Sequence, residues 1–162
     1  MGLGITKLKW PLLRDALIAG FIAISVNTLL IQFAPVIHIK AEGGGLFKLL
    51  LRYGRPITGH IAFLYTSSFG VLFHYLTGLV MVIIYVCWFA RLLKLSGWIK
   101  GSLFSLLPWL INGFIVLPLL GHGLLGYYKL SLTGILYFFT ANWIFGLLLG
   151  WLFDCLSISP HK

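Results

Sequence analysis

Charged side chains are scarce in this sequence. They make up 9% of its 162 residues, and only three of them are acids, Asp15, Glu42 and Asp154. A typical soluble domain is about 25% charged and about 45–50% apolar, whereas 60% of this chain is apolar. The composition excludes an ordinary water-soluble enzyme and a disordered chain, and it predicts a protein that crosses a membrane several times.

The shortage of acids and cysteines also excludes several kinds of chemistry. Two of the acids, Asp15 and Asp154, fall at the ends of apolar segments, so paired-carboxylate catalysis and carboxylate-bound Mg²⁺ are disfavoured. The cysteines, Cys87 and Cys155, form no CxxC motif and are expected to be small hydrophobic residues. The sequence therefore favours a non-catalytic protein, with an enzyme that acts on lipids as the less favoured alternative.

Four apolar segments are long enough to cross a bilayer, because about 20 helical residues span about 30 Å of hydrocarbon. Each crossing must be helical, since lipid offers no hydrogen-bond partners to open backbone groups. We therefore predict an all-α membrane protein in which residues 1–162 form one bundle of four transmembrane helices. The predicted spans are Asp15 to Val36, Ser67 to Ala90, Gly101 to Leu120 and Leu132 to Phe153.

The connection between the first two spans is the only long one. After the flexible Gly43 to Gly45, the segment Leu46 to Tyr53 predicts a short amphipathic helix that lies in the membrane interface. Lys48 and Arg52, one helical turn apart, are expected to contact lipid headgroups. This helix either closes the outer end of the bundle or acts as a lid or a docking element for a partner.

The basic residues predict the orientation. Seven of them lie on the side that holds both termini and the second connection, and five lie on the other side. Because Lys and Arg are enriched in cytoplasmic segments, we expect an inner (plasma) membrane protein with both termini in the cytoplasm. The net charge of +9 is assigned to anionic headgroups rather than to nucleic acid, because the bases lie in short stretches between apolar segments.

Each predicted span carries one strongly polar side chain. These are Asn27, His74, Asn112 and Asn142, and helical spacing places each on a face with small residues. Polar groups in hydrocarbon normally face the interior of a bundle, so we expect the four to form one inward-facing layer. They either join in a hydrogen-bond cluster that fixes the bundle or line a polar cavity for a solute, a proton or a lipid headgroup.

The histidines allow a further hypothesis. His60 and His74 are 14 residues apart, and on an unbroken helix they would share a face about 21 Å apart. Membrane b-type cytochromes space haem ligands in this way, so His60 with His122 or His38 is a candidate site for haem b or a metal ion. The alternative is that these histidines are hydrated at the membrane interface, and no other cofactor is predicted.

Three segments resemble those of small bacterial four-span inner-membrane proteins of the YagU-like group. They are FHYLTG at residues 73–78, PLLGHG at residues 118–123 and NWIFG at residues 142–146 followed by Gly150. The resemblance implies a bacterial inner-membrane protein and brings no established activity with it. The chain has Asn142 where the group often has histidine, which weakens a two-histidine metal or haem site.

The function that the sequence favours is a non-catalytic one: an accessory or assembly subunit, or a lipid-binding module, built around the polar layer. The absence of catalytic groups and the four inward-facing polar residues support this interpretation. The alternatives are a small transporter or channel component with a cavity that contains His74, and a haem- or metal-binding redox protein. The expected partners are membrane lipids, another protein or a second copy of the chain.

Overall fold

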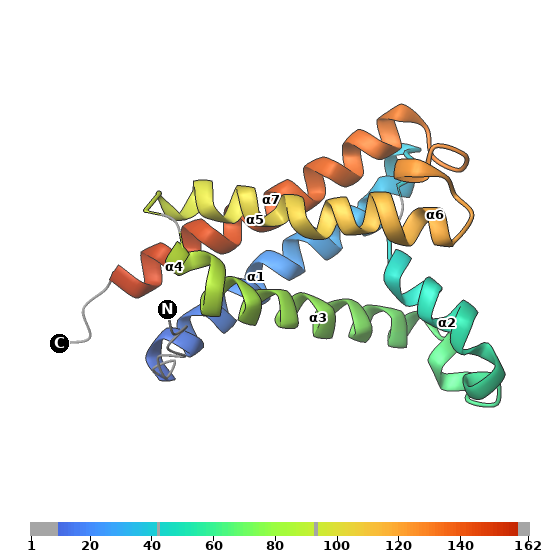
Figure 1. Cartoon of the computed structure of the whole chain (residues 1–162), viewed down its shortest axis with the longest axis horizontal. Coiled ribbons are helices and arrows are strands. Elements are labelled where there is room, and N and C mark those ends of the chain that lie inside the picture. Colours follow the sequence, from blue (N-terminus) through green and yellow to red (C-terminus); the bar gives the residue numbers. More distant parts are fainter. Residues whose placement is uncertain (1–9, 42, 93, 159–162) are drawn as a thin grey trace, which may run out of the picture.

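The computed structural model describes residues 10–41, 43–92 and 94–158. These residues form helices joined by turns and contain no β-strand (Figure 1). Within the described part of the chain, four helices are long and apolar enough to cross a membrane, namely Trp10–Ile37, Ser67–Phe89, Gly97–Leu119 and Leu132–Ser157. The predicted all-α architecture is therefore confirmed, and the protein is a polytopic membrane protein.

The four long helices contain several irregular turns. Helix α1 (Trp10–Phe33) ends in a 3₁₀ turn, η1 (Ala34–Ile37), and α7 (Leu132–Ile158) is continuous. The second long helix is α3 (Ser67–Ile84), which continues through a π-helical turn, η3 (Tyr85–Phe89), into α4 (Ala90–Leu92). The third is α5 (Gly97–Ile111), which continues through a π-helical turn, η4 (Asn112–Val116), into α6 (Leu117–Leu119). The helices α1 and α7 also extend beyond the predicted limits at Asp15 and Phe153.

Helices α5 and α7 make the most extensive contact in the bundle, and glycines allow it. A Cβ atom added at Gly101 would overlap the carbonyl oxygen of Gly146, and one added at Gly150 would overlap that of Gly97. Small residues permit this close backbone approach in membrane proteins. The pair Gly146 and Gly150, identified in the sequence as small residues one turn apart, is thus packed directly against α5.

The hydrophobic core occupies the half of the bundle nearer the ends of the described chain. Its fully buried members include Ala19, Val82, Phe104 and Leu149. Tyr85, on η3, packs edge-on against Phe104, with ring centroids 5.3 Å apart. The first described residue, Trp10, and the end of α7 lie at this same end of the molecule (Figure 1). The four helices are therefore tightly packed at one end.

At the other end the bundle is more open. Helix α3 packs mainly along α1, and it diverges from α5 and α6 toward the end where α2 lies (Figure 1). Helix α2 contacts both α3 and η4 across this divergence. Arg52 fastens α2 to the bundle, because its Nη1 donates a hydrogen bond of 2.8 Å to the carbonyl oxygen of Leu120.

Helix α2 (Gly45–Thr58) is longer than the predicted interfacial helix, Leu46 to Tyr53, because Gly54 and Pro56 do not end it. A 3₁₀ turn, η2 (Ala62–Tyr65), follows, and α3 begins after Thr66, whose hydroxyl accepts a hydrogen bond from the amide of Phe69. The backbone is extended at Thr66. His60 and His74 therefore do not share one unbroken helix, and the condition for the two-haem spacing is not met.

Candidate functional site

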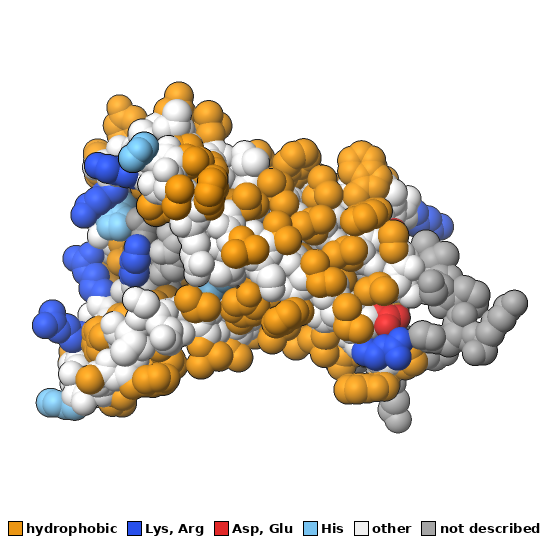
Figure 2. Space-filling model, turned by 180° about the vertical axis from the view of Figure 1, so that it is seen from behind, with side chains coloured by type: hydrophobic (Ala, Val, Ile, Leu, Met, Phe, Trp, Pro, Cys, Tyr) orange, Lys and Arg blue, Asp and Glu red, His pale blue; other side chains and the backbone are white. Residues whose placement is uncertain are grey.

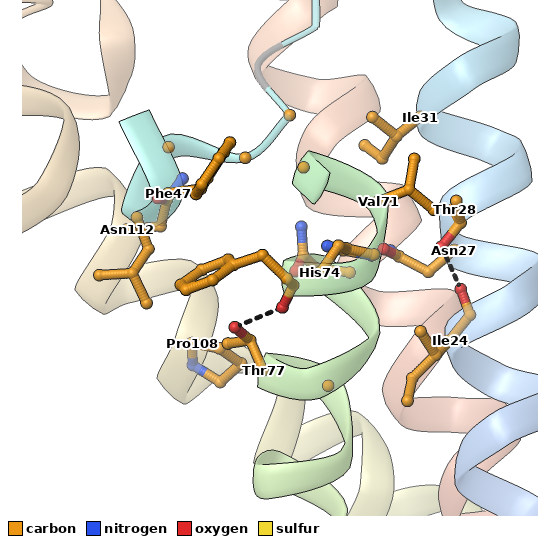
Figure 3. Close-up of a pocket in the computed structure, with 18 of the residues that line it drawn as sticks. Ile24, Asn27, Thr28, Ile31, Phe47, Val71, His74, Thr77, Pro108 and Asn112 are labelled. Carbon is orange, nitrogen blue, oxygen red and sulfur yellow. Dashed lines mark hydrogen bonds between the residues drawn. The ribbon is translucent and has the colours of Figure 1, made fainter. Parts of the chain in front are cut away.

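A cavity of about 420 Å³ lies between α1, α2, α3, α5 with η4, and α7 (Figure 3). Sites for small molecules and cofactors are typically about 300–1,000 Å³ and mostly apolar with a few polar groups. This cavity has that character. Its apolar lining includes Ile31, Val71, Phe73, Ile111, Val116 and Phe138.

All four polar residues singled out in the sequence line this cavity: Asn27 on α1, His74 on α3, Asn112 at the start of η4, and Asn142 on α7. Figure 3 shows Asn27 and Asn112 on opposite sides, with His74 between them. Asn27 is 6% exposed, and the other three are partly buried. The structure thus brings the four together around one space.

The hydrogen bonds of these four side chains do not form a mutual cluster. The Nδ2 of Asn27 donates to the carbonyl oxygen of Ala141 over 2.9 Å and joins α1 to α7. The Nδ2 of Asn142 donates within its own helix, to the carbonyl oxygen of Phe138 over 2.7 Å. His74 and Asn112 form no hydrogen bond with any residue that the structure describes. The polar groups of His74 and Asn112 are therefore available to a ligand.

Two threonines also line the cavity: Thr28, which was not singled out in the sequence, and Thr77, which helical spacing places on the same face as His74. The hydroxyl of Thr28 donates to the carbonyl oxygen of Ile24, and that of Thr77 donates to the carbonyl oxygen of Phe73, each over 2.8 Å (Figure 3). These hydroxyl donors are therefore already used within their own helices. The signal that identifies them is spacing, since Thr28 follows Asn27 and Thr77 lies about one turn after His74.

The first turn of α2 forms one wall of the cavity. Gly44 has a left-handed backbone with φ of 68°, and a Cβ atom at Gly45 would lie 2.7 Å from the Oδ1 of Asn112. Both positions therefore favour glycine. The Phe47 ring packs against Phe73 on α3, with centroids 5.1 Å apart. The GGG segment of the sequence thus allows α2 to enter between η4 and α3.

Basic side chains surround the end of the molecule at which α2 lies. Figure 2 shows Lys and Arg gathered at this end, beyond a broad hydrophobic band. The described acids, Asp15 and Asp154, lie instead toward the opposite end, where they pair with Arg14 and Lys100 at 2.9 and 3.7 Å. The basic residues of the α2 end are Lys40, Lys48, Arg52, Arg55 and Lys129.

The residues expected to contact headgroups have different surroundings. Lys48 is exposed and also lines the cavity. The guanidinium of Arg52 donates a hydrogen bond to the carbonyl oxygen of Leu120. Sequence reasoning did not anticipate that Lys48 belongs to the same site as the polar layer. The position of Lys48 in the sequence does not indicate that it lines the cavity, because α2 reaches the cavity only through the packing of its first turn.

The candidate haem or metal residues lie at the α2 end. His38 and His60 are exposed, and His38 has a left-handed backbone with φ of 57°. His122 lies in the turn after α6, where its backbone amide donates to the carbonyl of Leu117. Among the described residues, no three His, Cys, Asp or Glu side chains are grouped so that they could hold a metal ion. The redox hypothesis therefore gains no support from this geometry.

No family model, no curated protein and no solved structure matches the chain. The resemblance to the YagU-like group consequently stays a prediction.

Proposed function

We propose that this protein is a non-catalytic lipid-binding module, which holds one amphiphilic molecule in the cavity between its membrane-crossing helices. The observation that carries the proposal is the character of the cavity. About 420 Å³ of space is lined mostly by apolar side chains, and a few uncharged polar groups lie among them. Such a lining matches a molecule that is largely hydrocarbon and has a small number of hydrogen-bonding atoms.

The unused polar groups support an amphiphile over a plain hydrocarbon chain. His74 and Asn112 line the cavity and have no hydrogen bond within the described chain. Both residues are partly buried, and a polar group in a low-dielectric surrounding is more stable when it has a hydrogen-bond partner. A lipid ester, hydroxyl or amide group satisfies them, whereas an acyl chain alone does not.

The packing of the opposite half of the bundle favours binding over conduction. The cavity ends at Ile24 and Phe145, which belong to the hydrophobic core. Beyond them Val82, Phe104 and Leu149 are fully buried. A solute that entered from the α2 end would meet this packed core, so a closed binding site agrees with the geometry better than a transport path through one copy of the chain.

The proposal includes an inner (plasma) membrane location with both termini in the cytoplasm, which is the orientation that the distribution of basic residues favours; that the membrane is bacterial is what the resemblance to the YagU-like group implies. The α2 end of the cavity would then face the outer leaflet. A green fluorescent protein joined to the C-terminus should fluoresce, and an alkaline phosphatase joined there should be inactive. The reverse result would invert the orientation and assign the cavity to the inner leaflet.

Filling the cavity tests the binding function. Gly70 lines it, and an added Cβ atom there would lie 3.4 Å from the Phe47 ring, so Gly70→Ala fits whereas Gly70→Phe occupies the space. We expect native mass spectrometry of the wild-type protein and Gly70→Ala to detect one bound lipid per chain, and Gly70→Phe to have lost it. Val80→Phe, on an exposed face of α3, is the matched control and should retain the lipid.

Two results would contradict the proposal. One is a wild-type protein that carries no lipid when it is purified in mild detergent. The other is a folded Gly70→Phe variant that retains as much lipid as the Val80→Phe control.

A further inference from the structure

Four polar side chains in the cavity lining use a hydrogen-bond donor within the protein itself. Asn27 and Asn142 donate from Nδ2 to backbone carbonyl oxygens. Thr28 and Thr77 donate from their hydroxyls, also to backbone carbonyl oxygens. Because a carbonyl oxygen can only accept, these bonds fix the orientation of both amides. The atoms left over are the two amide oxygens and the two hydroxyl oxygens.

These four oxygens are hydrogen-bond acceptors without a donor. None of them accepts a hydrogen bond from a residue that the structure describes. Asn27 is the most enclosed of the four residues, with 6% of its surface exposed, yet its Oδ1 is not among the polar atoms that are fully enclosed without a partner. This oxygen is therefore reached from the cavity that Asn27 lines.

The two hydroxyl oxygens lie close to the contact between α1 and α3. Ile24 packs so closely against α3 that a Cβ atom added at Gly78 would lie 2.7 Å from its Cδ1. Thr28 lies one turn after Ile24, and Thr77 directly precedes Gly78, so both are within about one helical turn of this contact. Figure 3 shows the two threonines on these facing helices.

The two amide oxygens lie close to the contact between α1 and α7. The hydrogen bond from Asn27 to Ala141 joins these helices, and Asn142 is the next residue after Ala141. Asn27 also directly precedes Thr28, so the amide pair adjoins the hydroxyl pair. Three helices therefore present acceptor atoms to the same part of the cavity.

A set of acceptors selects a ligand that brings donors. Esters, ethers and ketones carry only acceptor oxygens, which would face the oxygens of the lining. A hydroxyl group both donates and accepts, so it also suits His74 and Asn112, whose side chains carry both kinds of atom. The four acceptors are uncharged, and a buried charge requires a charged or metal partner. A neutral hydroxyl therefore matches them better than an ammonium group.

We infer that the ligand of the cavity is a neutral lipid with free hydroxyl groups and one acyl chain, as in a monoacylglycerol. Its hydroxyls donate to the oxygens near the contact between α1 and α3, and its chain contacts apolar lining residues such as Met81 and Phe145. The volume of about 420 Å³ lies in the lower half of the range for small-molecule sites, which favours one chain over two. This assignment rests on the proposed lipid-binding function and names the class of lipid.

The hydroxyl preference is tested with the full-length protein in micelles of lauryldimethylamine oxide, a detergent that has no hydroxyl group. The two probes are 1-oleoylglycerol and its derivative with both hydroxyls methylated, and native mass spectrometry measures their binding. We expect wild-type protein to bind 1-oleoylglycerol about tenfold more tightly. Two hydrogen bonds are lost on methylation, and each contributes about threefold in a membrane interior.

The acceptors are tested with the double variant Thr28→Val and Thr77→Val, which keeps the side-chain shapes and removes two oxygens. We expect its preference for 1-oleoylglycerol to fall from about tenfold to about threefold or less. Thr140→Val is the control, because Thr140 makes the same kind of bond within α7 but is exposed and outside the described lining. This control should retain the tenfold preference. Thermal unfolding establishes that each variant is folded, and the ratio of two lipids is insensitive to a general loss of affinity.

The outcomes separate this assignment from the proposed function. Equal binding of the two probes by wild-type protein overturns the hydroxyl assignment and leaves lipid binding intact. A preference that survives in the double variant, or that is equally reduced in Thr140→Val, overturns the role of the threonine oxygens. Tighter binding of oleylamine than of 1-oleoylglycerol would identify an ammonium as the donor, and competition by free glycerol at the same concentration would show that the acyl chain is not required. No binding of any lipid overturns the proposed function itself.

Discussion

Replacing Gly101 with alanine should destabilise the bundle although alanine is the better helix former. The added Cβ atom would overlap the carbonyl oxygen of Gly146 and would lie 2.8 Å from the amide nitrogen of Gly150. Both are backbone atoms of α7, so neither can rotate away as a side chain would. The two helices must therefore move apart along the most extensive contact in the structure.

The magnitude follows from two opposing contributions. Helix propensity favours alanine over glycine by about 1 kcal/mol, whereas an added methyl group in a closely packed core costs about 1–3 kcal/mol. Because the overlap is with backbone, we expect a packing cost at the upper end of this range, so that the free energy of unfolding falls by about 2 kcal/mol once the gain in helix propensity is subtracted. Gly70→Ala is the matched control, since its Cβ atom would lie 3.4 Å from the Phe47 ring. This variant should be as stable as wild type or slightly more stable.

Unfolding in mixed micelles with increasing dodecyl sulfate measures the difference, and the six tryptophans supply the fluorescence signal. A Gly101→Ala protein that unfolds at the wild-type midpoint would show that the close contact between α5 and α7 is not what holds them together. An equal loss in Gly70→Ala would show that the effect comes from glycine replacement in general.

Three further predictions concern single side chains. Asn27→Leu should lower the free energy of unfolding by about 0.6–2 kcal/mol, because it removes the hydrogen bond to Ala141 on a neighbouring helix. Asn142→Leu should lower it less, because the hydrogen bond of Asn142 lies within α7. An equal loss of stability in both variants would refute this distinction. Tyr85→Phe should leave the melting temperature unchanged or raise it, since the buried hydroxyl has no hydrogen-bond partner among the residues that the structure describes; a lower melting temperature would reveal one. Arg52→Gln should increase hydrogen exchange in α2, because it removes the bond to the end of α6, and unchanged exchange would show that packing alone holds α2.

The four membrane-crossing helices were predictable because each crossing requires about 20 apolar residues, and such segments are plain in the sequence. Their ends were less predictable. Helix α1 begins at Trp10 and includes Arg14, since amphipathic side chains at the interface continue a helix while they contact water or headgroups. Helix α2 passes Gly54 and Pro56, two residues that usually end a helix, because local preferences are weak compared with tertiary contacts.

The polar layer was predictable from spacing, whereas the cavity was not. Helical periodicity and span length place Asn27 and His74 at similar depths and on inward faces, and this requires no knowledge of how the helices cross. The cavity depends on the divergence of α3 from α5 and on the entry of Gly45 beside Asn112, which only packing determines. The π-helical turn that begins at Asn112 was also missed.

The different packing of the two sides of the bundle has a common physical origin. Lipid tails are as apolar as leucine, so burial of apolar surface does not draw membrane helices together, and close contact requires small residues. Glycines on both partners provide that contact between α5 and α7. Between α3 and α5 the lining of the cavity instead includes His74 and Pro108. Burial of apolar surface in a lipid environment does not draw these two helices into close contact. Apolar tails can fill such a space, but they cannot supply acceptors to its donors. A bundle that is tight on one side and polar on the other therefore agrees with the proposed binding of a molecule that has both hydrocarbon and hydrogen-bonding atoms.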